Sequence, residues 1–206
     1  MSFVDTCTDL GVTYNRALSY TPHINNITAK ASLRAKLILK CFQTRDASIL
    51  MKAFVTFVRP ILEYASAVWN PHFKYDIDKV EAVQRRFTKK LAGYYKLPYA
   101  HRLAQLSIDS LQKRRIRTDL MLCFKMLHGL VDVNISSFFT LSDVLYTRGN
   151  SKKLAKPCSV SVRDANLFSK RIVKIWNSLP ENVVSASSFN SFKSRLASVH
   201  LPVLSY

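Results

Sequence analysis

Residues 76–92 read DIDKVEAVQRRFTKKLA, and this stretch decides the fold class. Its apolar side chains recur every three or four residues, the spacing of one face of an α-helix. These positions are Ile77, Val80, Val83, Phe87 and Leu91. Gly93 follows as a typical helix stop. The pattern predicts an amphipathic helix that buries one face and exposes a basic one.

The same periodicity predicts helices on both sides of this stretch. They are expected at residues 22–42, 46–69, 99–105, 109–128, 164–179 and 188–199. Pro60 should kink or restart the second of them, because proline removes an internal hydrogen bond. The expected N-caps are Thr21, Asp46, Asp109 and Asp164.

Strands are expected at few places. Residues 10–13 read as a short strand and turn without an obvious partner in the chain, which suggests continuation upstream. Residues 159–162 alternate with period two and predict a second short strand, after a turn at residues 148–150. The fold class is therefore mainly α: a helical bundle followed by a smaller helical C-terminal unit, with a short β segment at the N-terminus.

The charge is strongly positive. Lys and Arg number 31 against 13 Asp and Glu, a net charge of +18. A compact domain with this excess repels itself unless an anion binds, and nucleic acid is the commonest such partner. An anionic membrane surface is the rival interpretation, although no predicted helix combines a long basic face with a wide apolar one.

Other classes find little support. The four cysteines form no C-x-x-C pair, no histidine lies at zinc-finger spacing from them, and no nucleophile turn such as G-x-S-x-G occurs. We expect no metal, cofactor or small-molecule substrate. The first ten residues lack a basic segment, and no apolar run is long enough to span a membrane, so we expect an intracellular protein of the nucleus or cytoplasm, not a secreted one.

Five motifs follow one another along the chain. They are LGV at residues 10–12, VRPILEYA at 58–65 followed by VWNP at 68–71, VEAVQRRF at 80–87, IWNSLP at 175–180 and FNSFKSRL at 189–196. In this order and spacing the chain resembles the region after the polymerase palm in LINE-type (non-LTR) retrotransposon reverse transcriptases, of the jockey-like and chicken-repeat-like groups. The resemblance covers nearly the whole chain.

The resemblance implies a domain organisation. Residues 1–20 would be the truncated end of the palm, 21–129 a helical thumb-like domain, 130–165 a connecting segment and 166–206 a C-terminal helical unit. The family's active site uses two adjacent aspartates that hold Mg²⁺. This chain has no such pair, because Asp76 and Asp78 are separated by Ile77. We therefore expect a fragment of an RNA-directed DNA polymerase that is inactive alone, with Mg²⁺ only in the missing palm.

Two basic clusters are the predicted nucleic-acid-binding residues. They are Arg85, Arg86, Lys89 and Lys90, and Lys113, Arg114, Arg115 and Arg117. Cationic helix faces bind phosphates without sequence preference, which suits RNA and DNA in a primer–template or RNA–DNA hybrid. A basic helix start opposes the helix dipole, which favours a binding role for the second cluster. A solvated helix face is the alternative interpretation of both.

Further alternatives concern aromatic residues and the function as a whole. Trp69 and Trp176 are expected in the core, whereas Tyr94 and Tyr95 suit either nucleic-acid contact or packing. The loop lysines at 152 and 153 are expected to serve solubility. The alternative function is a non-enzymatic helical remnant of a mobile element that acts as a protein-interaction module or has no specific function.

Overall fold

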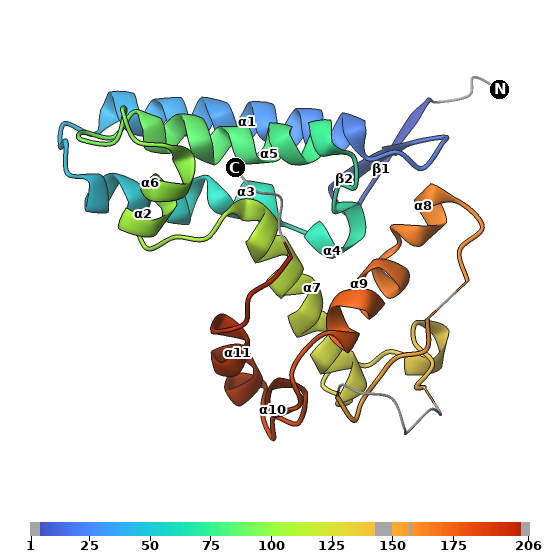
Figure 1. The fold of residues 1–206 in the computed structure, drawn as a ribbon. Helices are drawn as coiled ribbons and strands as arrows, with labels where there is room; N and C mark the ends of the chain where they lie inside the picture. The colour runs from blue at the N-terminus through green and yellow to red at the C-terminus, as the bar shows by residue number, and fades with distance from the viewer. Residues whose placement is uncertain (1–4, 143–149, 157, 203–206) are drawn as a thin grey trace. The chain divides into compact units, whose positions relative to one another are not determined.

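The computed structural model describes residues 5–142, 150–156 and 158–202 (Figure 1). It is mainly helical, with a short two-stranded sheet near the N-terminus, as the sequence predicts. The chain divides into two compact units. Among the described residues, the first unit lies within residues 5–112 and the second within residues 113–202.

The first unit is a helical bundle with a β-hairpin at its start. Its elements are β1 (Thr6–Asp9), β2 (Val12–Asn15), α1 (Thr21–Cys41), α2 (Ala47–Phe57), α3 (Arg59–Glu63), α4 (Ser66–Trp69), α5 (Lys74–Lys89) and α6 (Tyr99–Gln105). Helices α1 and α5 lie side by side (Figure 1). Their N-terminal ends are joined by Thr21, whose Oγ1 donates to the Asp76 carboxylate at 3.0 Å. The two longest helices of this unit therefore form one continuous face.

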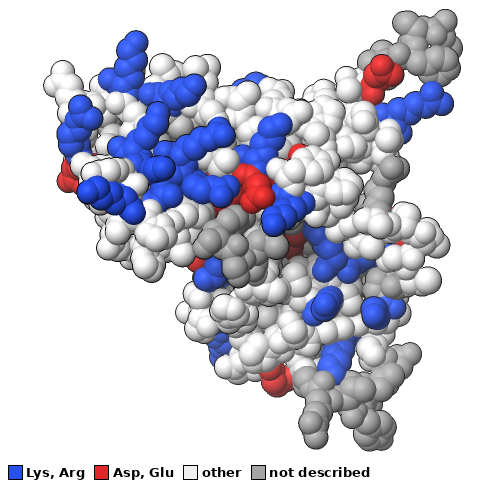
Figure 2. Space-filling model, turned by 45° about the horizontal axis from the view of Figure 1, so that its top comes forward, with Lys and Arg blue, Asp and Glu red and all other residues white. Residues whose placement is uncertain are grey.

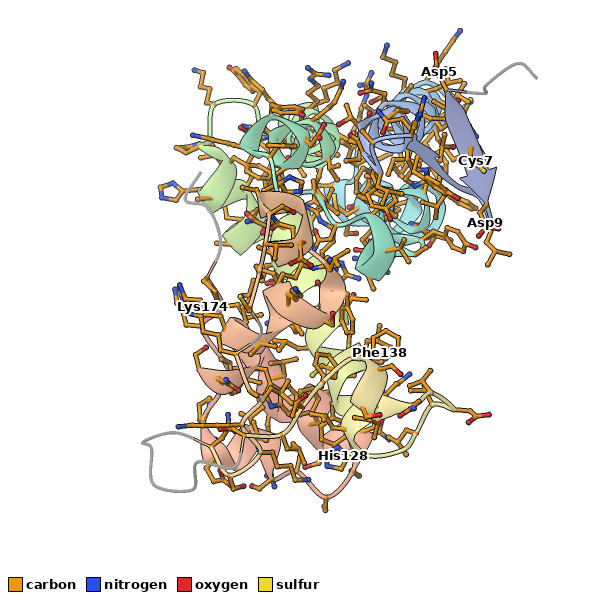
Figure 3. The ribbon with its side chains drawn as sticks, turned by 90° about the vertical axis from the view of Figure 1, so that its right-hand side faces the viewer. Asp5, Cys7, Asp9, His128, Phe138 and Lys174 are labelled. Carbon is orange, nitrogen blue, oxygen red and sulfur yellow. The ribbon has the colours of Figure 1, made fainter. Side chains whose placement is uncertain are left out.

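The hairpin supplies the partner that the sequence left unassigned. Strand β1 pairs antiparallel with β2, Asp9 facing Val12 across a two-residue turn. Both turn residues, Leu10 and Gly11, have positive φ (45° and 81°), as tight hairpin turns require. The expectation of a strand without a partner was wrong because every residue of β1 is exposed, so it carries no apolar alternation; Cys7 and Asp9 mark it in Figure 3.

Trp69 lies at the centre of the first core, fully buried as predicted. Its indole Nε1 donates to the Tyr64 carbonyl at 2.7 Å. The rings of Phe54 and Phe87 pack with centroids 4.6 Å apart, joining α2 to α5. Burying such aromatic side chains stabilises the unit by about 1.5–3 kcal/mol each. The apolar face of residues 76–92 therefore performs the packing that its periodicity predicts.

The second unit is built on most of α7 (Leu111–Leu127). It further contains a 3₁₀ turn (Ile135–Ser137), α8 (Val162–Ala165), α9 (Phe168–Asn177), α10 (Glu181–Val184) and α11 (Phe189–Ala197). Trp176 is fully buried in its core, as predicted, and its Nε1 donates to the Lys152 carbonyl at 2.8 Å. The rings of Phe124 and Phe192 stack at 4.3 Å.

The division between the units differs from the boundary expected after residue 129. It falls between residues 112 and 113, because Leu120 and Phe124 of α7 pack with the C-terminal helices. Residues 130–165 also contribute to that core, through the buried side chains of Phe139 and Leu154. The expected connecting segment is thus partly a packed element of the second unit.

Several local predictions are confirmed. Asp46 caps α2 by accepting from the Ser48 backbone N–H at 2.7 Å, Pro60 lies in the first turn of the restarted helix α3, and α6 has the predicted bounds. Helix α1 begins one residue earlier than predicted, so that Tyr20 and not Thr21 holds the N-cap position.

Others are wrong. Residues 159–162 form no strand; Val160 is 91% exposed, and Val162 begins α8. Asp164 lies within α8 and does not cap α9, whose N-cap position is Leu167. The period-two pattern failed here because its apolar side chains face solvent and not a sheet partner. The turn expected at residues 148–150 lies outside the described residues except for Asn150.

Candidate nucleic-acid interface

Three cations from two helices surround a groove between α1 and α5. Arg86 and Lys90, from α5 and its C-cap, line it together with Lys36 of α1, and all three residues are exposed. The groove has a volume of about 170 Å³. Arg86 and Lys90 face it because they are four residues apart, one turn of helix. Two of the predicted site residues therefore belong to one site, with a third cation contributed from 50 residues upstream.

The floor of this groove is apolar. Ala35, Leu39, Val83 and Phe87 line it, and Ser32 adds a hydroxyl. Ala35, Val83 and Phe87 are buried members of the first core. The three cations therefore belong to two packed helices and not to a loop. Because the core fixes these helices against each other, it also sets the spacing of the cations. We call this feature the α1–α5 groove.

More exposed cations lie on the same two helices. Figure 2 shows lysine and arginine side chains gathered over the surface that α1 and α5 form. The exposed basic residues of these helices beyond the groove itself are Lys30, Arg34, Lys40, Lys74, Lys79 and Lys89. Lys79 donates to the Asn25 side chain across the two helices. The predicted residue Lys89 is also exposed and precedes Lys90 in the sequence.

Arg85 points away from the groove. Its guanidinium lies 4.0 Å from the Asp78 carboxylate and 5.8 Å from the centre of the Tyr99 ring. Adjacent helical residues are about 100° apart around the axis, so Arg85 and Arg86 face different neighbours. The predicted cluster of four is therefore divided, with Arg85 held by α5 and α6 and Arg86 presented beside α1.

A buried carboxylate holds α5 in this orientation. Glu81 is completely buried and accepts hydrogen bonds from the Tyr99 hydroxyl and from the backbone N–H groups of Leu111 and Gln112, both at 3.1 Å. These two N–H groups begin α7, where a negative charge is favoured by the helix dipole. Glu81 therefore caps the start of α7 from the neighbouring helix α5.

A buried arginine adds to this arrangement. Arg102 of α6 donates to the Arg85 carbonyl at 2.7 Å and to Thr88 Oγ1 at 2.9 Å, near the C-terminal end of α5. The helix dipole places partial negative charge near this end of α5, so a cation there is favourable. The basic end of α5 is thus fixed from its buried side while Arg86, Lys89 and Lys90 remain exposed.

The second predicted cluster is not a uniform basic surface. Lys113 and Arg114 are half-buried, whereas Arg115 is only 1% exposed. Arg117 donates to the Ala197 carbonyl of α11 at 2.9 Å. The prediction that Arg115 lies on a phosphate-binding surface is corrected, because α7 turns this position inward along with Ile116. Arg117 is engaged by its own unit.

The structure agrees only in part with what the sequence predicts for two tyrosines, Tyr94 and Tyr95, and for two lysines, Lys152 and Lys153. Tyr94 packs against the first core, whereas Tyr95 is 60% exposed with the Lys96 ammonium 5.6 Å from its ring centre. Lys152 and Lys153 are half-buried, and the Lys152 Nζ lies 2.8 Å from His128 Nε2. Lys152 is therefore part of the packing of the second unit and not a loose loop cation.

Sequence reasoning missed Lys36 and the role of Glu81. Lys36 follows Ser32 at helical spacing on the flank of α1 that faces α5, but no local signal shows which flank has a basic neighbour. Glu81 occupies the buried side of α5 between Val80 and Gln84. A charge at a buried helical position is rarely there without partners, which is the signal that could have identified it.

Within residues 5–142, 150–156 and 158–202, no group of three His, Cys, Asp or Glu side chains could hold a metal ion. In the same part of the chain, every helix is too short or too polar to cross a membrane. All four cysteines are free thiols, and burial raises the pKa of the Cys123 thiol.

Comparisons with known proteins give one relative. No family model matches the chain, and no solved structure matches it. A curated Caenorhabditis elegans protein, Uncharacterized protein B0403.1, is 27% identical to it over 124 residues, which is 59% of this chain. The match spans about 63% of the length of that relative. Its name carries no activity, so the case for a function rests on the residues themselves.

Proposed function

We propose that this chain grips nucleic acid through the α1–α5 groove, as a thumb-like fragment of a retrotransposon-type reverse transcriptase that does not itself carry the active site. The observation that carries the proposal is the convergence of Lys36, Arg86 and Lys90 from two packed helices. The order of the five sequence motifs supports the same family. The partner is an RNA or DNA backbone in a primer–template or RNA–DNA hybrid.

The physical basis is the release of counterions. Each Lys or Arg that neutralises a phosphate releases condensed cations, so affinity falls steeply as salt rises and depends little on base sequence. A polymerase thumb needs this kind of grip, because it must hold any template. Arginine binds phosphate oxygens in a bidentate manner, whereas the lysines act as point charges. We assign Arg86 the orienting role and the two lysines the electrostatic one.

The rigid mounting of the cations favours binding over mere solvation. Side chains on packed helices hold their spacing better than loop side chains, so less ordering is required when a backbone binds. Glu81 and Arg102 hold α5 from its buried side, as described above. Catalysis is not part of this proposal, because the paired aspartates that the family uses are missing from the sequence.

The test is a salt titration of binding. Fluorescence anisotropy with an RNA–DNA hybrid should give a dissociation constant that rises steeply with salt. The variant K36Q/R86Q/K90Q should flatten the plot of log affinity against log salt by about one unit per cation removed. A matched control, K156Q/K174Q/K193Q, removes three exposed lysines of the second unit and should leave the slope nearly unchanged.

Two results would overturn the proposal. One is the absence of binding at low salt by the folded wild-type chain. The other is an equal loss of affinity in both triple variants, which would mean that net charge alone and not the groove attracts the ligand.

A further inference from the structure

Two rings, those of Phe73 and Tyr75, form an exposed stack where α5 begins, and the His72 ring lies beside it, tilted by 42°. The rings of Phe73 and Tyr75 are nearly parallel, with centroids 5.3 Å apart and an interplanar angle of 13°, and His72 lies against Phe73 at 4.0 Å. Phe73 is 45% exposed and Tyr75 is 58% exposed. Single exposed apolar side chains are ordinary, but adjacent aromatic rings that stack on one another form a candidate binding surface.

The stack continues into the basic residues of α5. Tyr75, Lys79, Arg86 and Lys90 fall within about 60° of one another around the helix axis, at about 100° per residue. All four are exposed. The distance along the axis from Tyr75 to Arg86 is about 16 Å, at about 1.5 Å per residue. One exposed stripe of α5 therefore presents an aromatic platform first and phosphate-binding cations after it.

This order of chemistry matches one class of ligand. Proteins that hold single-stranded nucleic acid combine a positive track for the backbone with aromatic side chains on which bases stack. A paired duplex hides its base faces, so it could use the cations but not the rings. An uncharged protein partner would explain the aromatic residues, but not the row of cations aligned with them. An anionic lipid surface would require a wide apolar face beside the cations, which this stripe of α5 lacks.

We propose that Phe73 and Tyr75 form a stacking platform for unpaired bases of a single strand whose backbone continues along the α1–α5 groove. This inference rests on the proposed function and narrows it, because it names single-stranded nucleic acid or the single-stranded end of a template as the preferred ligand. The rings select for accessible bases, while Arg86 and Lys90 supply the sequence-independent grip.

Two single-stranded probes distinguish binding to the bases from binding to the phosphates. Both are single strands of about 15 nucleotides, a length within the usual range of such sites. One is intact, and in the other the central bases are replaced by abasic sites, so the phosphate charge is the same. The wild-type chain should bind the intact strand about fivefold more tightly or better, as base stacking on aromatic residues predicts.

The variant F73A/Y75A should bind both strands with the weaker affinity of the abasic one. Its salt dependence should equal that of the wild type, because no charge is removed. Tyr75→Phe keeps the ring and should keep the preference for the intact strand. Phe138→Ala removes an exposed ring of the second unit, 42% exposed, and should change nothing.

The outcomes distinguish this inference from the proposed function. If the wild type binds the intact and abasic strands equally, with steep salt dependence, the groove stands and the stacking platform is wrong; this comparison needs no variant. Circular dichroism shows whether F73A/Y75A is folded. If the folded variant loses affinity for both strands equally, the rings act structurally and the inference is wrong. If the wild type binds neither strand nor the hybrid at low salt, both proposals fall.

Discussion

The two units contain nearly equal numbers of basic residues and use them differently. Residues 1–112 carry 16 Lys and Arg against 8 Asp and Glu, and residues 113–204 carry 15 against 5. In the first unit, Lys36, Arg86 and Lys90 are exposed around a groove between α1 and α5. In the second, Arg115 is buried, Arg117 binds the Ala197 carbonyl, and Arg171 pairs with Asp119. The number of cations in a unit therefore says less about binding than whether those cations are exposed or already bound to groups of the same unit.

Buried carboxylates explain much of this difference. In the first unit, Glu81 accepts from neutral donors and leaves the cations of α5 outside. In the second, Asp119 engages a guanidinium directly, with Arg171 Nε at 3.0 Å and a second nitrogen at 3.2 Å. Glu81 connects α5 to α6 and to the start of α7, whereas Asp119 forms an ion pair with Arg171.

The largest effect is expected from Glu81→Ala. It leaves the Tyr99 hydroxyl and the first two N–H groups of α7 without their buried acceptor, which should lower the free energy of unfolding by about 3–5 kcal/mol. Urea denaturation measures it. Glu63→Ala is the control, because Glu63 is half-buried and forms an i,i+4 ion pair with Arg59 at 3.8 Å, whereas Glu81 is the buried acceptor of three hydrogen bonds. Equal losses in the two variants would contradict the role given to Glu81.

The next effect concerns the second unit. Asp119→Ala leaves the Arg171 guanidinium, largely buried, without its carboxylate and should cost about 3 kcal/mol of unfolding free energy. The double variant D119L/R171M removes both charges and should recover most of that loss, since apolar residues of similar volume replace buried ion pairs well. A double variant as unstable as Asp119→Ala would show that the pair is needed for packing and not only for charge balance.

Single cations should separate the two units in binding. Arg86→Gln should weaken binding of the hybrid by about threefold to tenfold and reduce the salt slope by about one unit. Arg114→Gln, in the half-buried start of α7, should change affinity by less than about twofold, because this cation is not part of the groove. The same anisotropy titration measures both. A larger effect at Arg114 than at Arg86 would move the interface to the second unit.

The smallest effect is a pH dependence at His23. Burial, and secondly repulsion by Lys30, lower the pKa of this imidazole below its ordinary value of 6.5, and its Nδ1 accepts from the Thr13 backbone N–H. The unfolded chain therefore takes up the proton first, so the unfolding free energy should fall as pH drops below 6.5 and be unaffected above it. His23→Asn should remove this part of the pH dependence. A wild-type curve that is parallel to that of the variant from pH 8 to 5 would rule the effect out.

Local signals predicted the helices because their causes are local. The Asp46 cap, the restart at Pro60 and the bounds of α6 each follow from neighbouring residues. The strand expected at residues 159–162 failed because alternation means a strand only where a partner and a core exist, and here Val160 and Val162 face solvent. The hairpin partner was overlooked for the opposite reason, since β1 pairs through its backbone while its side chains are all exposed.

The candidate site was predicted in part. Arg86, Lys89 and Lys90 are exposed as the helical pattern of residues 76–92 requires. The residue types alone could not show that Arg85 and Arg115 differ from the basic residues beside them. Arg85 turns towards Asp78 and Tyr99, and Arg115 is buried. Lys36 was missed because its relevance depends on the helix that packs beside it.

The amino-acid sequence by itself determined the mainly helical class, the basic character of the chain, the burial of both tryptophans and the missing aspartate pair, since each depends on residue type and on spacing within a few turns. Only the tertiary structure decided which cations share a surface. That outcome depends on the rotation of α1 against α5, which is set by packing between residues far apart in the chain, such as Ala35 with Val83 and Phe87. Helical spacing assigns a residue to a face, but only packing assigns that face a neighbour.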